Sequence, residues 1–152
     1  WDYLCRGERH PPRDADLLPL RGTVPGDPRC LFLSGGNGIY AGRMAWLVCG
    51  DRVLASLELA DSPQTRRRGL LGRDGIEGTI LLKPAGWVHT VGMRFAIDVA
   101  HLDADLTVLR TVTMERRRIG RRVRGARMVL EAESGSFAKW GLGVGDQLTV
   151  RE

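Results

Sequence analysis

Several features that mark whole classes of protein are missing from this sequence. No stretch approaches the roughly 20 consecutive apolar residues that a membrane-spanning helix needs, and no apolar segment follows a basic start as in an export signal. Cysteine is rare: Cys5, Cys30 and Cys49 are odd in number and show no C-x-x-C spacing, which argues against a disulfide framework and a zinc knuckle. We therefore expect a cytoplasmic protein, in which Cys49 is a buried apolar residue of the stretch A-W-L-V-C.

The sequence also lacks the commonest catalytic and cofactor motifs. It contains no G-x-S-x-G nucleophile turn and no G-x-x-x-x-G-K phosphate loop, and its three histidines include no pair at metal-ligand spacing. We therefore expect no metal and no cofactor, and these motifs give no support for an enzyme.

Lysine is scarce as well, because Lys83 and Lys139 are the only lysines among 23 basic residues, and the formal net charge is +5. An arginine bias of this kind is typical of polyanion binding, but a GC-rich coding sequence produces it too. We favour the compositional explanation, since the basic residues are scattered along the chain except in one segment.

A length of 152 residues, with 43% hydrophobic and 27% charged residues, is typical of one globular domain. Residues 1–43 differ from the rest because they hold five of the seven prolines and show no sustained period of 2 or 3.6. Met44 is the first methionine and directly precedes the first apolar stretch. We expect residues 1–43 to be upstream sequence or a disordered extension and residues 44–152 to form the domain; the alternative is an N-terminal arm packed on that domain.

Short apolar segments separated by turn residues dominate residues 44–152. The segments 46–49 and 53–59 flank Gly50-Asp51, a pair suited to a tight turn, and so predict a hairpin. Further strands are predicted at 79–83, 95–102, 106–114, 127–131 and 147–151. About seven short strands predict an all-β domain, an antiparallel jelly-roll-like sandwich or small barrel with one or two short helices.

Two segments carry the signals of short helices. The first is predicted over 63–71, with Asp61 or Ser62 as its N-cap and Gly72 as its end. The second is F-A-K-W, for which Ser134 or Ser136 would supply the cap.

Four signatures occur in a specific order and spacing: T-R-R-R-G-L-L-G-R, H-T-V-G-M-R-F-A-I-D, V-L-E followed by Ser134-Gly135, and L-G-V-G-D. With them, residues 44–152 resemble the DUF192 family of bacterial and archaeal proteins, which has no established activity. The central segment departs from the W-M-K-N-T form of many members, so no role of that lysine or asparagine can be transferred to Val91 or Gly92. The resemblance implies a mainly β, jelly-roll-like or barrel-like domain and brings no chemistry.

Asp98 lies in an otherwise apolar strand, where an unpaired carboxylate would cost several kcal/mol. Arg94 is roughly 13 Å away along an ideal strand, too far for a direct pair. We expect an ion pair with Arg68 or Arg73 instead, and the alternative is a carboxylate that faces a ligand.

His89 and Thr90 precede Gly92, where the backbone can approach a ligand or another strand closely. A lone histidine of this kind is either a hydrogen-bonded structural residue or part of a site. If the polar residues of these segments form a shallow ligand-binding cleft, its edges are Arg68, Arg73, His89, Thr90, Arg94 and Asp98, with the segment 115–127 beside it.

The segment 115–127, E-R-R-R-I-G-R-R-V-R-G-A-R, has seven arginines among its thirteen residues and no aromatic residue. It is predicted to be a loop between two strands, either solvated and mobile or binding an anionic partner such as nucleic acid, a lipid headgroup or an acidic protein. An acidic protein or nucleic acid would contact Arg116, Arg117, Arg118, Arg121, Arg122 and Arg124.

From these observations we expect a monomeric, non-enzymatic module that binds a small or anionic ligand or an acidic partner. Two alternatives stay open: a small hydrolase-like enzyme that uses His89 and Asp98 as an acid and base pair, and an RNA-binding protein that uses the loop 115–127.

Overall fold

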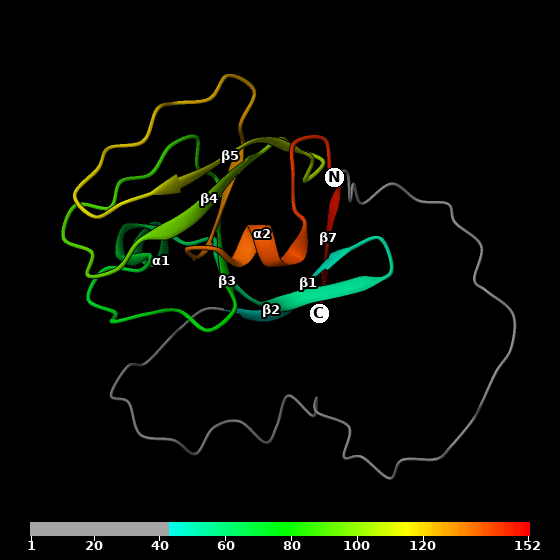
Figure 1. Cartoon of the computed structure of the whole chain (residues 1–152), viewed down its shortest axis with the longest axis horizontal. Coiled ribbons are helices and arrows are strands. Elements are labelled where there is room, and N and C mark those ends of the chain that lie inside the picture. Colours follow the sequence, from blue (N-terminus) through cyan, green and yellow to red (C-terminus); the bar gives the residue numbers. More distant parts are fainter. Residues whose placement is uncertain (1–42) are drawn as a thin grey trace, which may run out of the picture. The chain divides into compact units, whose positions relative to one another are not determined.

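The computed structural model describes residues 43–152, so the prediction that residues 1–43 are an extension falls, apart from Arg43, outside the described part of the chain. In the described residues, seven strands form one curled sheet accompanied by two short helices (Figure 1). This confirms the predicted mainly β fold, and the curl gives the sheet the form of half a small barrel.

The sheet has the strand order β5-β4-β6-β3-β2-β1-β7. All neighbouring strands are antiparallel except β2 and β3, which are parallel and are connected through α1. Neither helix of the described part is long and apolar enough to cross a membrane. The elements are β1 (Arg43–Cys49), β2 (Arg52–Ala60), α1 (Pro63–Arg68), β3 (Thr79–Leu82), β4 (Ile97–Leu102), β5 (Val108–Met114), β6 (Met128–Glu133), α2 (Ser136–Trp140) and β7 (Leu148–Arg151).

The predicted hairpin connects β1 and β2. Cys49 pairs with Arg52 across the turn, and Gly50 adopts a φ of 58°, which glycine tolerates at little cost. Cys49 is buried, as predicted.

Helix α1 begins where the sequence predicts and ends earlier. The Ser62 hydroxyl accepts a hydrogen bond from the Thr65 amide at 3.1 Å, and the Thr65 hydroxyl accepts one from the Ser62 amide at 3.1 Å. The expected end at Gly72 is wrong, because Gly69 terminates the helix with a φ of 44° and donates its N–H to the Thr65 carbonyl at 2.8 Å. The chain therefore leaves the helix after Arg68, and the next residue but one, Leu70, packs into the core.

The sheet buries both of its faces. Along β6, Leu130 packs in the cluster that includes Phe137 of α2, whereas Val129 packs in the cluster that includes Leu70 after α1. Because side chains alternate along a strand, Glu131 lies on the same face as Val129, the α1 face. This alternation decides which charged residues can meet.

The two edge strands come together at one end of the sheet. The Leu148 amide donates to the Leu106 carbonyl at 3.0 Å, the Gly145 amide donates to the Val108 carbonyl at 2.8 Å, and Thr107 and Gln147 form an isolated bridge. These bonds pair backbone N–H and C=O groups that would otherwise be unpaired at the two edges of the sheet.

Candidate functional site

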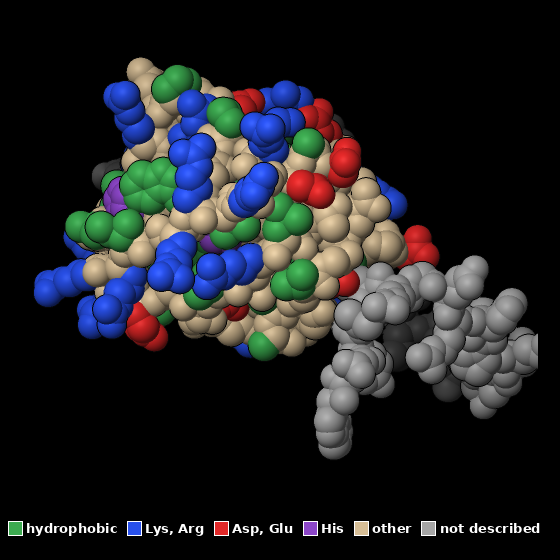
Figure 2. Space-filling model, turned by 90° about the horizontal axis from the view of Figure 1, so that it is seen from above, with side chains coloured by type: hydrophobic (Ala, Val, Ile, Leu, Met, Phe, Trp, Pro, Cys, Tyr) green, Lys and Arg blue, Asp and Glu red, His purple; other side chains and the backbone are tan. Residues whose placement is uncertain are grey.

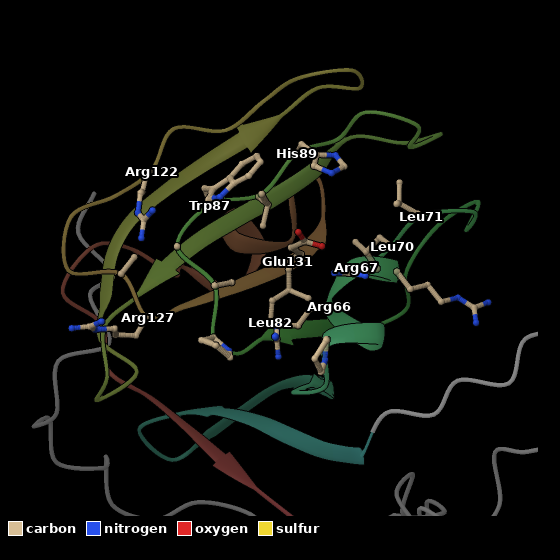
Figure 3. A pocket seen from close by; sticks show the side chains of 18 of the residues that line it. Arg66, Arg67, Leu70, Leu71, Leu82, Trp87, His89, Arg122, Arg127 and Glu131 are labelled. Atoms are coloured by element: carbon tan, nitrogen blue, oxygen red, sulfur yellow. The ribbon is translucent and has the colours of Figure 1, made fainter.

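A cleft of about 670 Å³ opens on the α1 face of the sheet (Figure 3). Its walls come from α1 and the residues after it, from the segment 82–89, and from the end of the loop before β6. The volume lies in the range of about 300 to 1,000 Å³ that is typical of small-molecule sites. Five arginines and one acidic residue are among the residues that line it: Arg66, Arg67, Arg68, Arg122, Arg127 and Glu131.

Three of these arginines form the last turn of α1. Cations are favourable there, because the carbonyl groups at a helix C-terminus carry partial negative charge. The Arg66 guanidinium donates to the Asp61 carbonyl at 2.6 Å and to the Lys83 carbonyl at 3.2 Å, which ties the helix to the chain that leaves β3. Arg67 and Arg68 are exposed at the cleft.

Glu131 of β6 is the acidic residue of the cleft and is only 4% exposed. In Figure 3 its carboxyl group points into the space between α1 and the segment that carries Trp87 and His89. Burial raises the pKa of the Glu131 carboxyl to about 7, and the nearby positive charge of Arg73 opposes this rise. The carboxyl group therefore exchanges a proton close to neutral pH.

A second carboxylate lies on the same face. Glu58 of β2 pairs with Ile80 of β3, and Ile80 pairs with Glu131 of β6, so the two acidic residues are two strands apart, roughly 10 Å between Cα atoms. Arg73 donates from one guanidinium nitrogen to both Glu58 carboxylate oxygens, at 3.0 and 2.8 Å. Arg73 thus neutralises Glu58 directly, and its positive charge also acts on Glu131.

Aromatic side chains stand at the rim of the cleft. Trp87 is 46% exposed, and its ring centroid lies 6.2 Å from that of His89 at an interplanar angle of 48°. Leu70, Leu82 and Val88 supply apolar surface nearby. The cleft therefore combines positive charge with apolar and aromatic surface.

The arginine-rich loop 115–127 is hydrogen-bonded to this rim. The Thr90 hydroxyl donates to the Glu115 carbonyl at 2.6 Å and accepts from the Arg118 amide at 2.8 Å, while the Gly120 amide donates to the Val88 carbonyl at 2.8 Å. The backbone of the loop is therefore bonded to the rim of the cleft, and its arginine side chains are exposed. Figure 2 shows Lys and Arg side chains gathered on one face, with hydrophobic and histidine side chains among them.

Asp98 lies on the opposite face of the sheet from the cleft. It is 4% exposed and accepts hydrogen bonds from the Thr113 hydroxyl at 2.7 Å, the Gly135 amide at 2.9 Å and the Phe137 amide at 3.1 Å. The predicted ion pair with Arg68 or Arg73 is wrong, because these three donors from β5 and the start of α2 occupy the carboxylate instead.

The same contacts correct the predicted cap of α2. Neither Ser134 nor Ser136 caps this helix; the N-cap is Gly135, with a φ of 88° and no side-chain cap of its own. The Asp98 carboxylate takes over this role from a strand 37 residues earlier. Such a contact is not visible in the local sequence.

The cleft brings together only some of the six predicted site residues. Arg68 and His89 line it, whereas Thr90 is buried under the arginine-rich loop. Arg94 points outward and pairs with exposed Asp74 at 2.6 Å. Of the remaining two, Arg73 is paired with Glu58, and Asp98 is bonded to the start of α2.

Sequence reasoning missed the residue at the base of the cleft. Glu131 was part of the signature V-L-E, which we read only as strand and family pattern. The available signal was a glutamate in the middle of M-V-L-E-A, where its neighbours are all apolar. A glutamate in such a strand predicts either a partner or a site.

Within residues 43–152, no group of three or more His, Cys, Asp or Glu side chains is placed to hold a metal ion. His101 does not change this picture, because it is buried in β4 with both ring nitrogens unpartnered among the described residues.

Comparison with known proteins agrees with this fold. A model of the DUF192 family, described as "Uncharacterized ACR", matches residues 47–150. Among solved structures, a "putative transcription regulator" from Sinorhizobium meliloti 1021 is 21% identical, with a TM-score of 0.63 over 76% of this chain and 98% of that chain. A protein of unknown function from Novosphingobium aromaticivorans DSM 12444 is 17% identical, with a TM-score of 0.60 over 76% of this chain and 99% of that chain. These identities show the fold alone, and no curated protein matches the chain.

Proposed function

Because the chain belongs to the DUF192 family, whose description assigns no activity, we propose a function from its cleft: the protein binds a small anionic ligand there without transforming it. The observation that carries this proposal is the convergence of five arginines from two distant segments on one cleft with a single acidic residue. Arginine suits this task because its planar guanidinium binds carboxylates and phosphates through two parallel hydrogen bonds.

The rest of the lining indicates what kind of anion would fit. Trp87 and His89 at the rim, and Leu70 and Met93 inside, offer surface to a planar or apolar part of the ligand. An organic anion of metabolite size would use both kinds of surface.

The test is a thermal-shift screen of the full chain with phosphate, pyrophosphate, citrate and nucleoside monophosphates at low and moderate salt. A ligand that binds the folded state raises the unfolding midpoint. We expect a rise that is lost in Arg67→Ala and Arg122→Ala, whose side chains line the cleft from opposite walls.

The matched control is Arg151→Ala, which removes the same charge from an exposed residue of β7 outside the cleft. If none of the anions raises the midpoint, or if Arg151→Ala abolishes the rise as fully as Arg67→Ala, the cleft is not an anion site.

A second candidate function is RNA binding on the arginine-rich loop. The loop itself has no aromatic residue, but its hydrogen bonds to the segment 86–90 place it beside Trp87, which is exposed and could stack on a base. We expect an unstructured RNA oligonucleotide to bind with an affinity that falls steeply with salt and is reduced by Arg121→Ala and Trp87→Ala. Fluorescence anisotropy measures this, and no binding at low salt would rule the function out.

The acid and base pair of His89 and Asp98 forms no part of the proposal. His89 lines the cleft, whereas the Asp98 carboxylate is bonded to the start of α2 on the other face of the sheet.

A further inference from the structure

Glu131 differs from the other buried carboxyl groups of the described chain in having no hydrogen-bond donor there. Asp98 has three donors, and the Asp146 carboxylate accepts from the Gly143 amide at 2.8 Å. Glu58, which is partly buried, is paired with Arg73. Glu131 is as buried as Asp98, yet no residue of 43–152 donates to it, and its carboxyl group faces the cleft.

The Glu131 carboxyl oxygens open onto the cleft rather than being sealed in the core, so whatever enters the cleft, water or a ligand, must donate to them. A ligand that displaces this water without bringing a donor leaves the carboxyl group unpaired, which is costly. The cleft walls give it no such donor, although they carry much positive charge. The charged and titratable groups on the elements around Glu131 are Arg66, Arg67 and Arg68 of α1, Arg73 with its partner Glu58, His89, and Arg122 and Arg127 of the loop. A ligand there meets cations on its outside and one carboxyl group at its inner end.

These two demands conflict for a simple anion. The arginines attract negative charge, but an ionised Glu131 repels it and can only accept a hydrogen bond. A ligand meets both demands when it carries an O–H or N–H donor next to its negative charge.

We propose that Glu131 selects, among small anions, those that bring their own hydrogen-bond donor, such as hydrogen phosphate or a hydroxy acid. This inference rests on the proposed function, since it assumes that the cleft binds anions. A site built to bond a ligand donor rejects an analogue that lacks it, because its buried polar group is then left unpaired.

Phosphate and sulfate form a matched pair of probes for this selection. The two ions have nearly the same size and tetrahedral shape, but hydrogen phosphate keeps one P–O–H group at about pH 8, whereas sulfate has no proton to donate there. Sulfate can be bonded to Glu131 only when the carboxyl group itself is protonated. The high pKa of Glu131 places this change near neutral pH.

The experiment is isothermal titration calorimetry of the full chain with phosphate and with sulfate at about pH 6 and about pH 8. For the wild-type protein we expect the affinity for sulfate, relative to that for phosphate, to fall by about tenfold from the lower to the higher pH, because sulfate binding requires a proton on Glu131. Glu131→Gln offers an amide donor at every pH, so we expect its preference for phosphate at pH 8 to disappear. The ionisation of phosphate and any change of charge on His89 are the same in both proteins, so the comparison isolates Glu131.

The outcomes separate this inference from the proposed function. The inference is overturned, and the anion site stands, if both anions bind and the ratio of their affinities is independent of pH. The same conclusion follows if Glu131→Gln keeps the wild-type preference for phosphate over sulfate. If neither anion binds at any pH, the proposed function fails and the inference fails with it. Should Glu131→Gln not fold, Glu131→Ala replaces it: alanine neither repels nor bonds either anion, so the part of the pH dependence that Glu131 supplies should be absent from this variant as well.

Discussion

Glu131 makes the stability of the protein depend on pH in a direction that is unusual for an acidic residue. Its pKa in the folded state is about 7, above the ordinary value of 4.5, because burial disfavours the charged form. Between these two pH values the folded state holds a proton that the unfolded state has lost. Stability contributed by the protonated carboxyl is therefore fully present below about pH 4.5 and is lost as the pH rises to about 7.

The magnitude follows from the same values. A rise in pKa from 4.5 to about 7, at about 1.4 kcal/mol for each pH unit, corresponds to about 3 kcal/mol of unfolding free energy. Glu131→Gln cannot ionise and should not show this loss. We therefore expect the stability of the variant, relative to the wild type, to increase by about 3 kcal/mol between acidic and weakly alkaline pH.

Urea unfolding of both proteins from about pH 4.5 to about pH 8 measures this difference, and the contributions of the other titrating groups cancel in the comparison. Glu133→Gln is the control, because it changes an exposed carboxylate two residues along the same strand. A stability difference between wild type and Glu131→Gln that stays constant across this range would refute the reasoning.

Three further predictions concern the scaffold of the site. Asp98→Ala should lower the unfolding free energy by about 3 kcal/mol, because it leaves the buried Phe137 amide, the half-buried Gly135 amide and the Thr113 hydroxyl without their acceptor. Asp98→Asn retains one acceptor oxygen and should lose less, and urea unfolding compares the two variants. Burial lowers the pKa of His101 below 6.5, and Arg110 lowers it further, so the neutral ring contributes stability that is lost as the pH falls below 6.5. His101→Leu cannot ionise at this position, so its unfolding free energy, measured by urea unfolding at acidic and neutral pH, should not show this loss. Gly120→Ala places a methyl group 2.8 Å from a backbone carbonyl oxygen and should displace the arginine-rich loop, which faster trypsin cleavage there would reveal, whereas Gly143→Ala has open space and should not change the cleavage.

The helices and strands could largely be predicted because their signals are local. The turn residues Gly50-Asp51, the cap Ser62 and the apolar segments act through bonds between residues close in sequence. The end of α1 was misjudged because Gly69 and Gly72 are both competent to end a helix, and the sequence does not rank them. Only the packing of Leu70 into the core decides in favour of the earlier one.

The cleft was predicted less well, because it is built by segments that are distant in sequence. Two of its residues, Arg68 and His89, were predicted, but Thr90 and Arg94 point elsewhere. The loop 115–127 could be recognised as cationic, yet only its hydrogen bonds to the segment 86–90 bring it to an aromatic side chain.

Asp98 and Glu131 show most clearly what each level decides. By itself, the sequence determined that both are acidic residues inside apolar strands, and hence that each needs a partner. Only the tertiary structure decided what the partners are, because a carboxylate's environment depends on which donors distant segments bring to it. Strand β4 turns Asp98 toward three donors from β5 and α2, while β6 turns Glu131 toward the opposite face, where the arginines of α1 and of the loop leave a cleft above it.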